Sequence, residues 1–182
     1  MDLAGVCRPA SGVGGDYYDF LELPEGRIGI AVGDVAGKGV PAAILMATLQ
    51  ASVRGLAGVS GDNVAQMRVR INRALESSSA SNRYATFFFA LYDPATGILR
   101  YVNCGHNPPY LFRAPDCQEC EALEKGGSVL GLLPEVEFEE GTVELRAGDY
   151  LVAYSDGLSE AMNPAGEEWA KNGCSRRLAA AP

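Results

Sequence analysis

The feature that most constrains the fold is the glycine-rich stretch at residues 33–39, where the hydrophobic pattern changes its period. Before it, residues 17–23 and 27–34 carry apolar runs typical of strands, joined by a turn signal around Pro24. After it, apolar residues recur at helical spacing from Ile44 to Leu56, and Pro41 suits the first turn of a helix. The sequence therefore predicts a hairpin of strands that leads directly into a long helix.

The rest of the chain predicts a second helix and then a return to strands. Asp62 is the expected N-cap of that helix, and its apolar face contains Val64, Met67, Ile71 and Leu75. Strands are expected at residues 2–7, 85–92, 98–103, 110–113, 142–145 and 150–154, with hairpin turns at 93–97 and 146–149. Because strands and helices are segregated along the chain, an α+β fold is favoured over a parallel βαβ sheet.

Length, charge and cysteine content narrow the class of protein. The 182 residues are expected to form a single domain. The formal net charge of -8, without basic clusters, argues against a nucleic-acid partner. No apolar run approaches the roughly 20 residues of a membrane span, so no membrane partner is expected. Five cysteines without regular spacing favour a reducing compartment, which predicts a cytoplasmic location.

Three aspartates are the candidate functional residues. Asp34 and Asp156 each follow an apolar run, and Asp16 follows a Gly-Gly pair just before another. Carboxylates gathered at strand ends are suited to hard divalent cations such as Mg²⁺ or Mn²⁺. The alternative for Asp34 is that it caps the following helix. Asp19, three residues after Asp16, is expected to point away from it and to have a structural role.

Other chemistries fit the sequence less well. A P-loop requires four residues between its first glycine and its Gly-Lys pair, whereas three separate Gly33 from Gly37. None of the five cysteines has an arginine six residues later, as a cysteine-phosphatase loop requires. His106 is the only histidine, and it is expected to bond its own loop's backbone rather than to act in catalysis. Cys117 and Cys120 form a Cys-x-x-Cys pair without the second pair that structural zinc needs.

The motifs resemble those of the PPM-type metal-dependent protein serine/threonine phosphatases, in their bacterial sigma-regulator (SpoIIE-like) branch. The resemblance covers about residues 5–168 in the right order and leaves an atypical tail at 169–182. The stretches that carry it are residues 8–20, 33–43, 85–87, 103–109, Gly131 and 148–161.

This resemblance implies an α/β/β/α sandwich, in which two mostly antiparallel sheets are flanked by helices. Asp16, Asp34 and Asp156 are then expected to bind two cations, Mn²⁺ or Mg²⁺, with the backbone carbonyl of Val35 as a further ligand. The implied reaction is hydrolysis of phosphoserine or phosphothreonine by a metal-activated water. The implied substrate is a phosphorylated regulatory protein such as an anti-sigma-factor antagonist.

The chain departs from the family pattern after Asp156, because no later aspartate supplies the family's last metal ligand. We therefore expect a truncated C-terminal part, a weakened second metal site and, as the alternative function, a non-catalytic or weakly active binding module with the phosphatase fold. A lost terminal strand would also expose a sheet edge, which predicts a homodimer. The first motif stands almost at the start of this sequence, so control is expected to come from a separate partner, from expression or from a domain outside this sequence.

Overall fold

Two β-sheets form the centre of the computed structural model, which describes residues 1–9, 14–58, 63–78, 83–115, 120–134, 137–164 and 166. The six-stranded sheet has the order β1-β2-β3-β4-β7, with β8 also paired to β4, and the three-stranded sheet has the order β6-β5-β9. Only β4 and β7 pair in parallel among these strands.

The elements that the structure describes agree with most of the predicted ranges. They are β1 (Tyr17–Glu22), the 3₁₀ turn η1 (Pro24–Gly26), β2 (Ile28–Val35), α1 (Val40–Ala57), α2 (Val64–Ser78), β3 (Ala85–Asp93), β4 (Ile98–Cys104), β5 (Tyr110–Phe112), β6 (Cys120–Ala122), β7 (Gly126–Gly127), β8 (Gly141–Glu144), β9 (Tyr150–Val152) and α3 (Asp156–Ser159).

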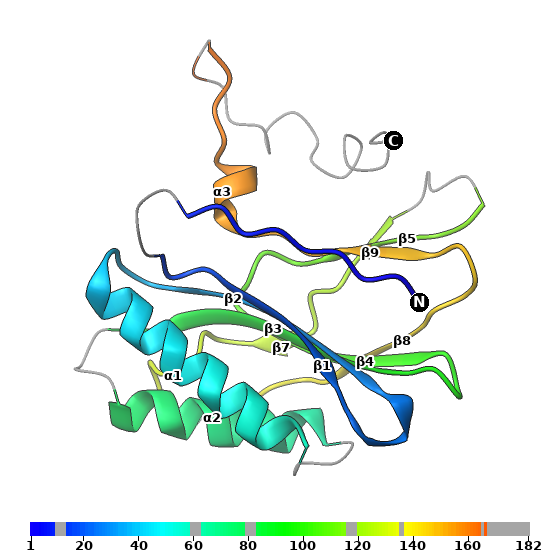
Figure 1. Ribbon diagram of the computed structural model, residues 1–182, viewed down its shortest axis with the longest axis horizontal. Helices are drawn as coiled ribbons and strands as arrows, with labels where there is room; N and C mark the ends of the chain where they lie inside the picture. The colour runs from blue at the N-terminus through cyan, green and yellow to red at the C-terminus, as the bar shows by residue number, and fades with distance from the viewer. Residues whose placement is uncertain are drawn as a thin grey trace.

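Strand β3 explains why the fold has layers on both faces of the larger sheet. Phe87 and Phe89 belong to the core shared with the helices, whereas Phe88 between them belongs to the core shared with β5 of the smaller sheet. Since successive side chains of a strand point to opposite faces, an unbroken buried run such as this one requires cover on both sides. The predicted α+β sandwich of mostly antiparallel sheets flanked by helices is thus confirmed (Figure 1).

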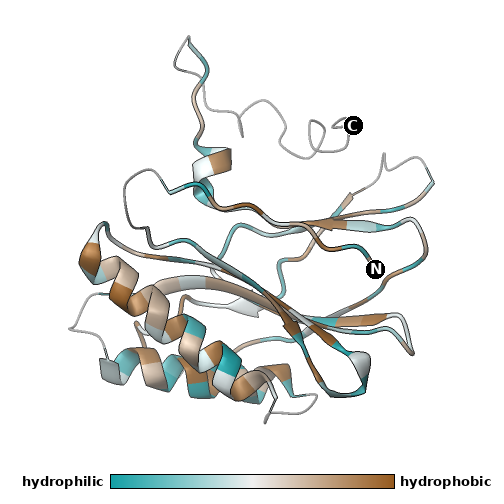
Figure 2. Cartoon of the chain, in the orientation of Figure 1, coloured by the Kyte–Doolittle hydropathy of each residue, from teal (hydrophilic) through white to brown (hydrophobic). Residues whose placement is uncertain are grey.

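Helices α1 and α2 lie together against the larger sheet (Figure 1). Leu49 and Val53 of α1 are fully buried, as is Ile71 of α2, while hydrophilic residues occupy other positions of both helices (Figure 2). Asn63 caps α2, because its Oδ1 accepts a hydrogen bond of 2.6 Å from the backbone N–H of Gln66. The predicted cap, Asp62, lies outside the described residues.

Helix α1 is, among the described residues, the one helix long and apolar enough to cross a membrane by length and composition alone. The sequence prediction that no apolar run approaches this length therefore needs qualification. In this fold the apolar side chains of α1 pack in the protein core, where Ala42, Leu45 and Leu49 are buried.

Two sequence predictions about strands are wrong. Residues 2–7 do not form a strand, because they have no ladder partner in the part of the chain that the structure describes. Residues 146–149 do form a turn, in which the N–H of Asp149 bonds the Arg146 carbonyl at 3.0 Å, but the turn does not close a hairpin. Strand β8 pairs with β4 and β9 pairs with β5, so this turn carries the chain from one sheet to the other.

Candidate metal centre

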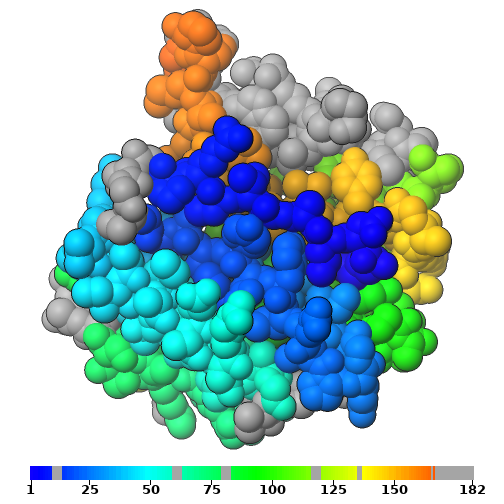
Figure 3. Space-filling model, in the orientation of Figure 1, coloured from blue at the N-terminus to red at the C-terminus, as the bar shows by residue number. Residues whose placement is uncertain are grey.

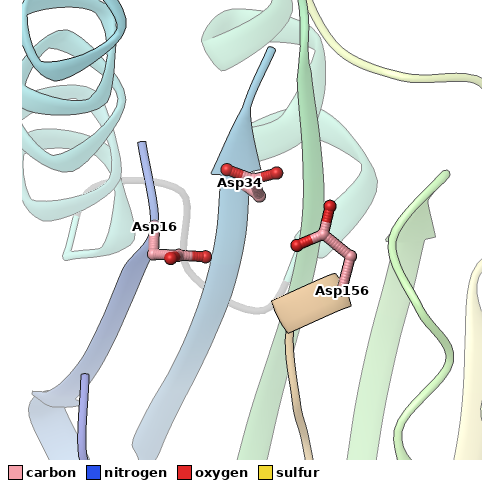
Figure 4. A group of neighbouring side chains, drawn as sticks. All are labelled: Asp16, Asp34 and Asp156. Atoms are coloured by element: carbon pink, nitrogen blue, oxygen red, sulfur yellow. The ribbon is translucent and has the colours of Figure 1, made fainter. Parts of the chain in front are cut away.

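Three carboxylates from separate segments meet at one end of the sandwich. Asp16 lies directly before β1, Asp34 lies near the end of β2, and Asp156 begins α3. One oxygen of each lies within 4.8 Å of the others (Figure 4). The structure therefore brings together all three aspartates that the sequence identified, although Asp156 lies more than a hundred residues after the other two along the chain.

Gly15 allows Asp16 to approach the end of β2. The backbone N–H of Val35 donates to the Gly15 carbonyl at 3.3 Å, which fixes the two segments side by side. A Cβ atom at position 15 would lie 2.7 Å from the Val35 carbonyl oxygen and 3.1 Å from Asp34 Oδ1. Only a residue without a side chain fits this approach, and the same contact places the Val35 carbonyl, a predicted ligand, next to the first motif.

The electrostatics of Asp34 reflect this crowding. Burial, followed by the charges of Asp156 and Asp16, raises its pKa from 3.8 to about 6, and a hydrogen bond from the Val35 backbone opposes the rise. Asp34 does not cap α1, whose N-cap is Gly39 without a side-chain bond. The helix-cap alternative for Asp34 is therefore wrong.

The donor set fits a hard divalent cation. Asp16 Oδ1 is buried and, among the atoms that the structure describes, has no hydrogen-bond partner. A buried carboxylate oxygen without a donor is unfavourable unless a cation or water satisfies it. Oxygen ligands of this kind suit Mg²⁺ and Mn²⁺ better than metals that favour thiolate or imidazole. Asp16, Asp34 and Asp156 are the side chains that could hold such ions.

Asp19 lies outside this cluster, as predicted, and has a structural partner. The guanidinium of Arg54 on α1 donates to both carboxylate oxygens of Asp19, from Nε to Oδ2 at 2.7 Å and from Nη2 to Oδ1 at 2.8 Å. The hydroxyl of Tyr17 donates to Oδ2 at 3.1 Å. Asp19 thus links β1 to α1. The pKa of Tyr17 is raised, first by the burial of its own hydroxyl and then by the negative charge of Asp19.

His106 does not make the contact that the sequence suggested. Its Nδ1 lies 2.9 Å from the hydroxyl of Thr86 on β3, rather than on the backbone of its own loop. Burial lowers the pKa of His106, with the Tyr154 backbone, Asp156 and Asp16 acting in the opposite direction, so the buried ring favours the neutral form. Of the Cys-x-x-Cys pair, Cys120 is exposed on β6 and Cys117 lies outside the described residues.

Sequence reasoning missed three polar residues around the cluster, namely Thr86, Asn107 and Ser159. Thr86 is the cross-strand neighbour of Asp34, and its hydroxyl donates to the Asp34 carbonyl at 3.4 Å. The available signal was that all three residues stand inside stretches that carry the family resemblance.

A cavity of about 940 Å³ reaches the cluster at Asp16, whereas Asp34 and Asp156 are not among its lining residues. It is lined by residues 1–8, by parts of β1 and β2 and by residues around β9, and it extends to Asp16 and Ser155. The N-terminal residues, dark blue in Figure 3, lie across this face of the molecule. The cluster therefore adjoins open space rather than being sealed inside the sandwich.

Comparison with known proteins agrees with this fold. The family description "Stage II sporulation protein E (SpoIIE)" matches residues 24–182. The chain belongs to this family, in the sigma-regulator branch of the PP2C-type phosphatases.

Individual relatives cover most of this chain. It is 31% identical over 160 residues to the phosphoserine phosphatase RsbU of Bacillus subtilis (strain 168), with 88% of this chain and 47% of RsbU covered. The RsbU and RsbW domains of Rv1364c from Mycobacterium tuberculosis superpose with a TM-score of 0.79 at 28% identity, covering 96% of this chain and 48% of that one. The chain thus spans about half the length of these relatives.

The phosphatase domain of SpoIIE from Bacillus subtilis has the same fold. That structure, of the PP2C domain with a fragment of the regulatory domain, superposes with a TM-score of 0.78 at 22% identity and covers 94% of this chain and 49% of that chain.

Proposed function

We propose that this domain hydrolyses phosphoserine or phosphothreonine on a regulatory protein, such as an anti-sigma-factor antagonist, with Mn²⁺ or Mg²⁺ as cofactor. The observation that carries the proposal is the convergence of Asp16, Asp34 and Asp156 within 4.8 Å. Family membership supports the reaction class, and the relative RsbU is named a phosphoserine phosphatase.

Each residue of the cluster has a distinct proposed role. Asp34 lies with Asp16 and Asp156 to either side (Figure 4), and this arrangement supports its proposed role as the ligand shared by two cations. Asp16 and the Val35 carbonyl would complete one position, and Asp156 would hold the other. When bound, such cations polarise a phosphoryl oxygen and lower the pKa of a water molecule, which supplies the nucleophile without a covalent enzyme intermediate.

The negative cluster also explains why the reaction should depend on metal. Three carboxylates repel a phosphate dianion, and burial together with the charges of Asp156 and Asp16 already raises the pKa of Asp34. The adjoining cavity of about 940 Å³ gives a phosphorylated side chain room to approach the cluster. The remaining cavity wall, with residues of β1 and β9, would contact the polypeptide on either side of the phosphorylated residue.

The test is hydrolysis of p-nitrophenyl phosphate by the chain as it stands, with Mn²⁺, with Mg²⁺ and with excess EDTA. We expect turnover with Mn²⁺, none with EDTA and none for Asp34→Ala. Asp93→Ala is the matched control, because Asp93 ends β3 at the other end of the sheet, about 20 Å from Thr86 by strand length. Activity that persists in both EDTA and Asp34→Ala would overturn the proposal. Mn²⁺ binding without turnover would favour the non-catalytic binding module.

Further properties are proposed on the basis of the sequence. We propose a cytoplasmic location, no nucleic-acid or membrane partner, and a homodimer formed through an exposed sheet edge. Strand β9 has one ladder partner, β5, among the described strands, which makes its other edge the site for pairing. Sedimentation velocity over a wide concentration range tests the dimer, and a single monomeric species throughout would contradict it.

A further inference from the structure

One of the connections between the two sheets is hydrogen-bonded to residues that contact Asp34 and Asp156. Strand β4 of the larger sheet ends at Cys104, and β5 of the smaller sheet begins at Tyr110. Residues 103–107 comprise the end of β4 and the start of this crossing, and we refer to them as the 103–107 segment. Two polar side chains of this segment reach in different directions, one toward Asp34 and the other toward Asp156.

The first side chain is His106, which reaches Asp34 through Thr86. The Thr86 hydroxyl donates to the Asp34 carbonyl at 3.4 Å and lies 2.9 Å from His106 Nδ1. The tautomer of the ring sets which of the two atoms donates in this second bond, and either direction connects His106 to Asp34 through Thr86. His106 is 6% exposed and Thr86 is half-buried, so this connection is partly buried.

The second side chain is Asn107, which reaches Asp156 through Ser159. The Asn107 amide donates to the Ser159 hydroxyl at 3.2 Å, and that hydroxyl donates to the Asp156 carbonyl at 3.2 Å. Helix α3 is a single turn, and this contact joins it to the segment.

The 103–107 segment is itself held firmly. Asn103 is buried, its Oδ1 accepts a 2.8 Å hydrogen bond from the backbone N–H of His106, and its amide donates to the Leu123 carbonyl at 3.3 Å. Gly105 has a φ of 68°, and a Cβ there would lie 2.8 Å from a methyl carbon of Val129. Because the segment is fixed in this way, His106 and Asn107 can hold their partners, Thr86 and Ser159, in defined positions.

Backbone pairing cannot set the distance between Asp34 and Asp156. Asp34 belongs to the six-stranded sheet, Asp156 follows β9 of the three-stranded sheet, and the two sheets share no ladder among the described strands. We infer that the 103–107 segment positions these two carboxylates for shared cation binding, with His106, Thr86, Asn107 and Ser159 as positioning residues. This inference rests on the proposed metal-dependent function and adds residues that do not contact the ions or the substrate.

The test measures Mn²⁺ affinity directly, from the electron paramagnetic resonance signal of free Mn²⁺ during titration of the metal-free chain. Thr86→Val and Ser159→Ala should each raise the Mn²⁺ dissociation constant about 10–100-fold, as loss of an outer contact to a metal ligand typically does. His106→Asn, which keeps a polar atom near Nδ1, should bind Mn²⁺ more tightly than His106→Leu.

Matched controls separate positioning from general stability. Thr48→Val and Ser77→Ala remove hydroxyls whose bonds go only to the preceding turn of their own helices, at 3.1 Å in both cases. Both should leave the Mn²⁺ dissociation constant within about twofold. The metal-free melting temperature of Ser159→Ala should equal that of the wild type, because Ser159 lies in a one-turn helix with no buried residue.

The outcomes distinguish this inference from the function on which it rests. If the wild type binds Mn²⁺ and Thr86→Val and Ser159→Ala bind it equally well, the positioning role is overturned and the proposed function is unaffected. If the wild type binds no Mn²⁺, the proposed function and the inference both fail. Weaker binding in the two variants, with unchanged controls and partial rescue by His106→Asn, supports the positioning role.

Discussion

Replacing Asp34 with asparagine should stabilise the metal-free protein at neutral pH, although it removes a central residue of the site. Burial and the charges of Asp156 and Asp16 raise the pKa of Asp34 from 3.8 to about 6. Since one pKa unit corresponds to about 1.4 kcal/mol, ionised Asp34 destabilises the folded state by at most about 3 kcal/mol. Because Asp34 is only partly buried, solvent screening reduces the expected effect to about 1–2 kcal/mol.

The pH dependence of this effect has a defined sign. A pKa of about 6 in the folded state, against 3.8 as the ordinary value, means that the folded chain binds the proton more tightly. The stability that the folded state gains from holding the proton on Asp34 is fully present below pH 3.8 and is lost as the pH rises to about 6. Asparagine cannot ionise, so Asp34→Asn does not lose this stability as the pH rises. The variant should therefore gain about 1–2 kcal/mol at pH 7.5, roughly 3–6 °C in melting temperature, and little near pH 3.8.

The assay is thermal and urea unfolding, followed by circular dichroism, in EDTA at pH 4 and pH 7.5. Asp93→Asn is the control, since its side chain keeps the oxygen that accepts the 2.9 Å hydrogen bond from Ala95. Adding Mn²⁺ should raise the melting temperature of the wild type and not that of Asp34→Asn, which reverses their order. An Asp34→Asn variant no more stable than the wild type at pH 7.5, or equally stabilised at both pH values, would refute the reasoning.

Three further substitutions test the packing that supports the site. Gly15→Ala brings a Cβ within 2.7 Å of a backbone carbonyl and should weaken Mn²⁺ binding at least about tenfold by the same resonance titration, whereas Gly55→Ala has open space and should not. Ile71→Ala removes a fully buried side chain and should lower the unfolding free energy by about 2–5 kcal/mol in urea. Arg54→Met leaves the buried Asp19 carboxylate without its cation, so the melting temperature should fall, and less so in an Asp19→Asn background.

Local signals in the sequence were sufficient for most of the secondary structure. The hairpin at Pro24 and the two helices depend on turn residues and on periodic apolar positions close together in the chain, and the structure reproduces them. The turn at residues 146–149 shows the limit of such signals. Its residues favour a tight turn, as observed, but whether the flanking strands pair with each other depends on the partners β4 and β5, which lie far away in the sequence.

The same limit applies to the candidate site. Asp16, Asp34 and Asp156 were recognisable because each is a lone carboxylate beside an apolar run. No comparable local pattern distinguished Thr86, because threonine is a common residue in strands. Its importance follows from the register that places it opposite Asp34, and register is set by the pairing of β2 with β3 over eight residue pairs.

Two aspartates on neighbouring strands, Asp19 and Asp34, have opposite electrostatic surroundings, which indicates that the cluster is built for cations. Asp19 on β1 meets the guanidinium of Arg54 at 2.7 Å, so this fold supplies a basic side chain where a carboxylate serves packing. Asp34 on β2 has no such partner among the groups that set its pKa, which are two further carboxylates and the Val35 backbone. Three like charges held together at such a cost in stability are explained if a bound cation neutralises them, because only the metal-free protein then carries their full repulsion.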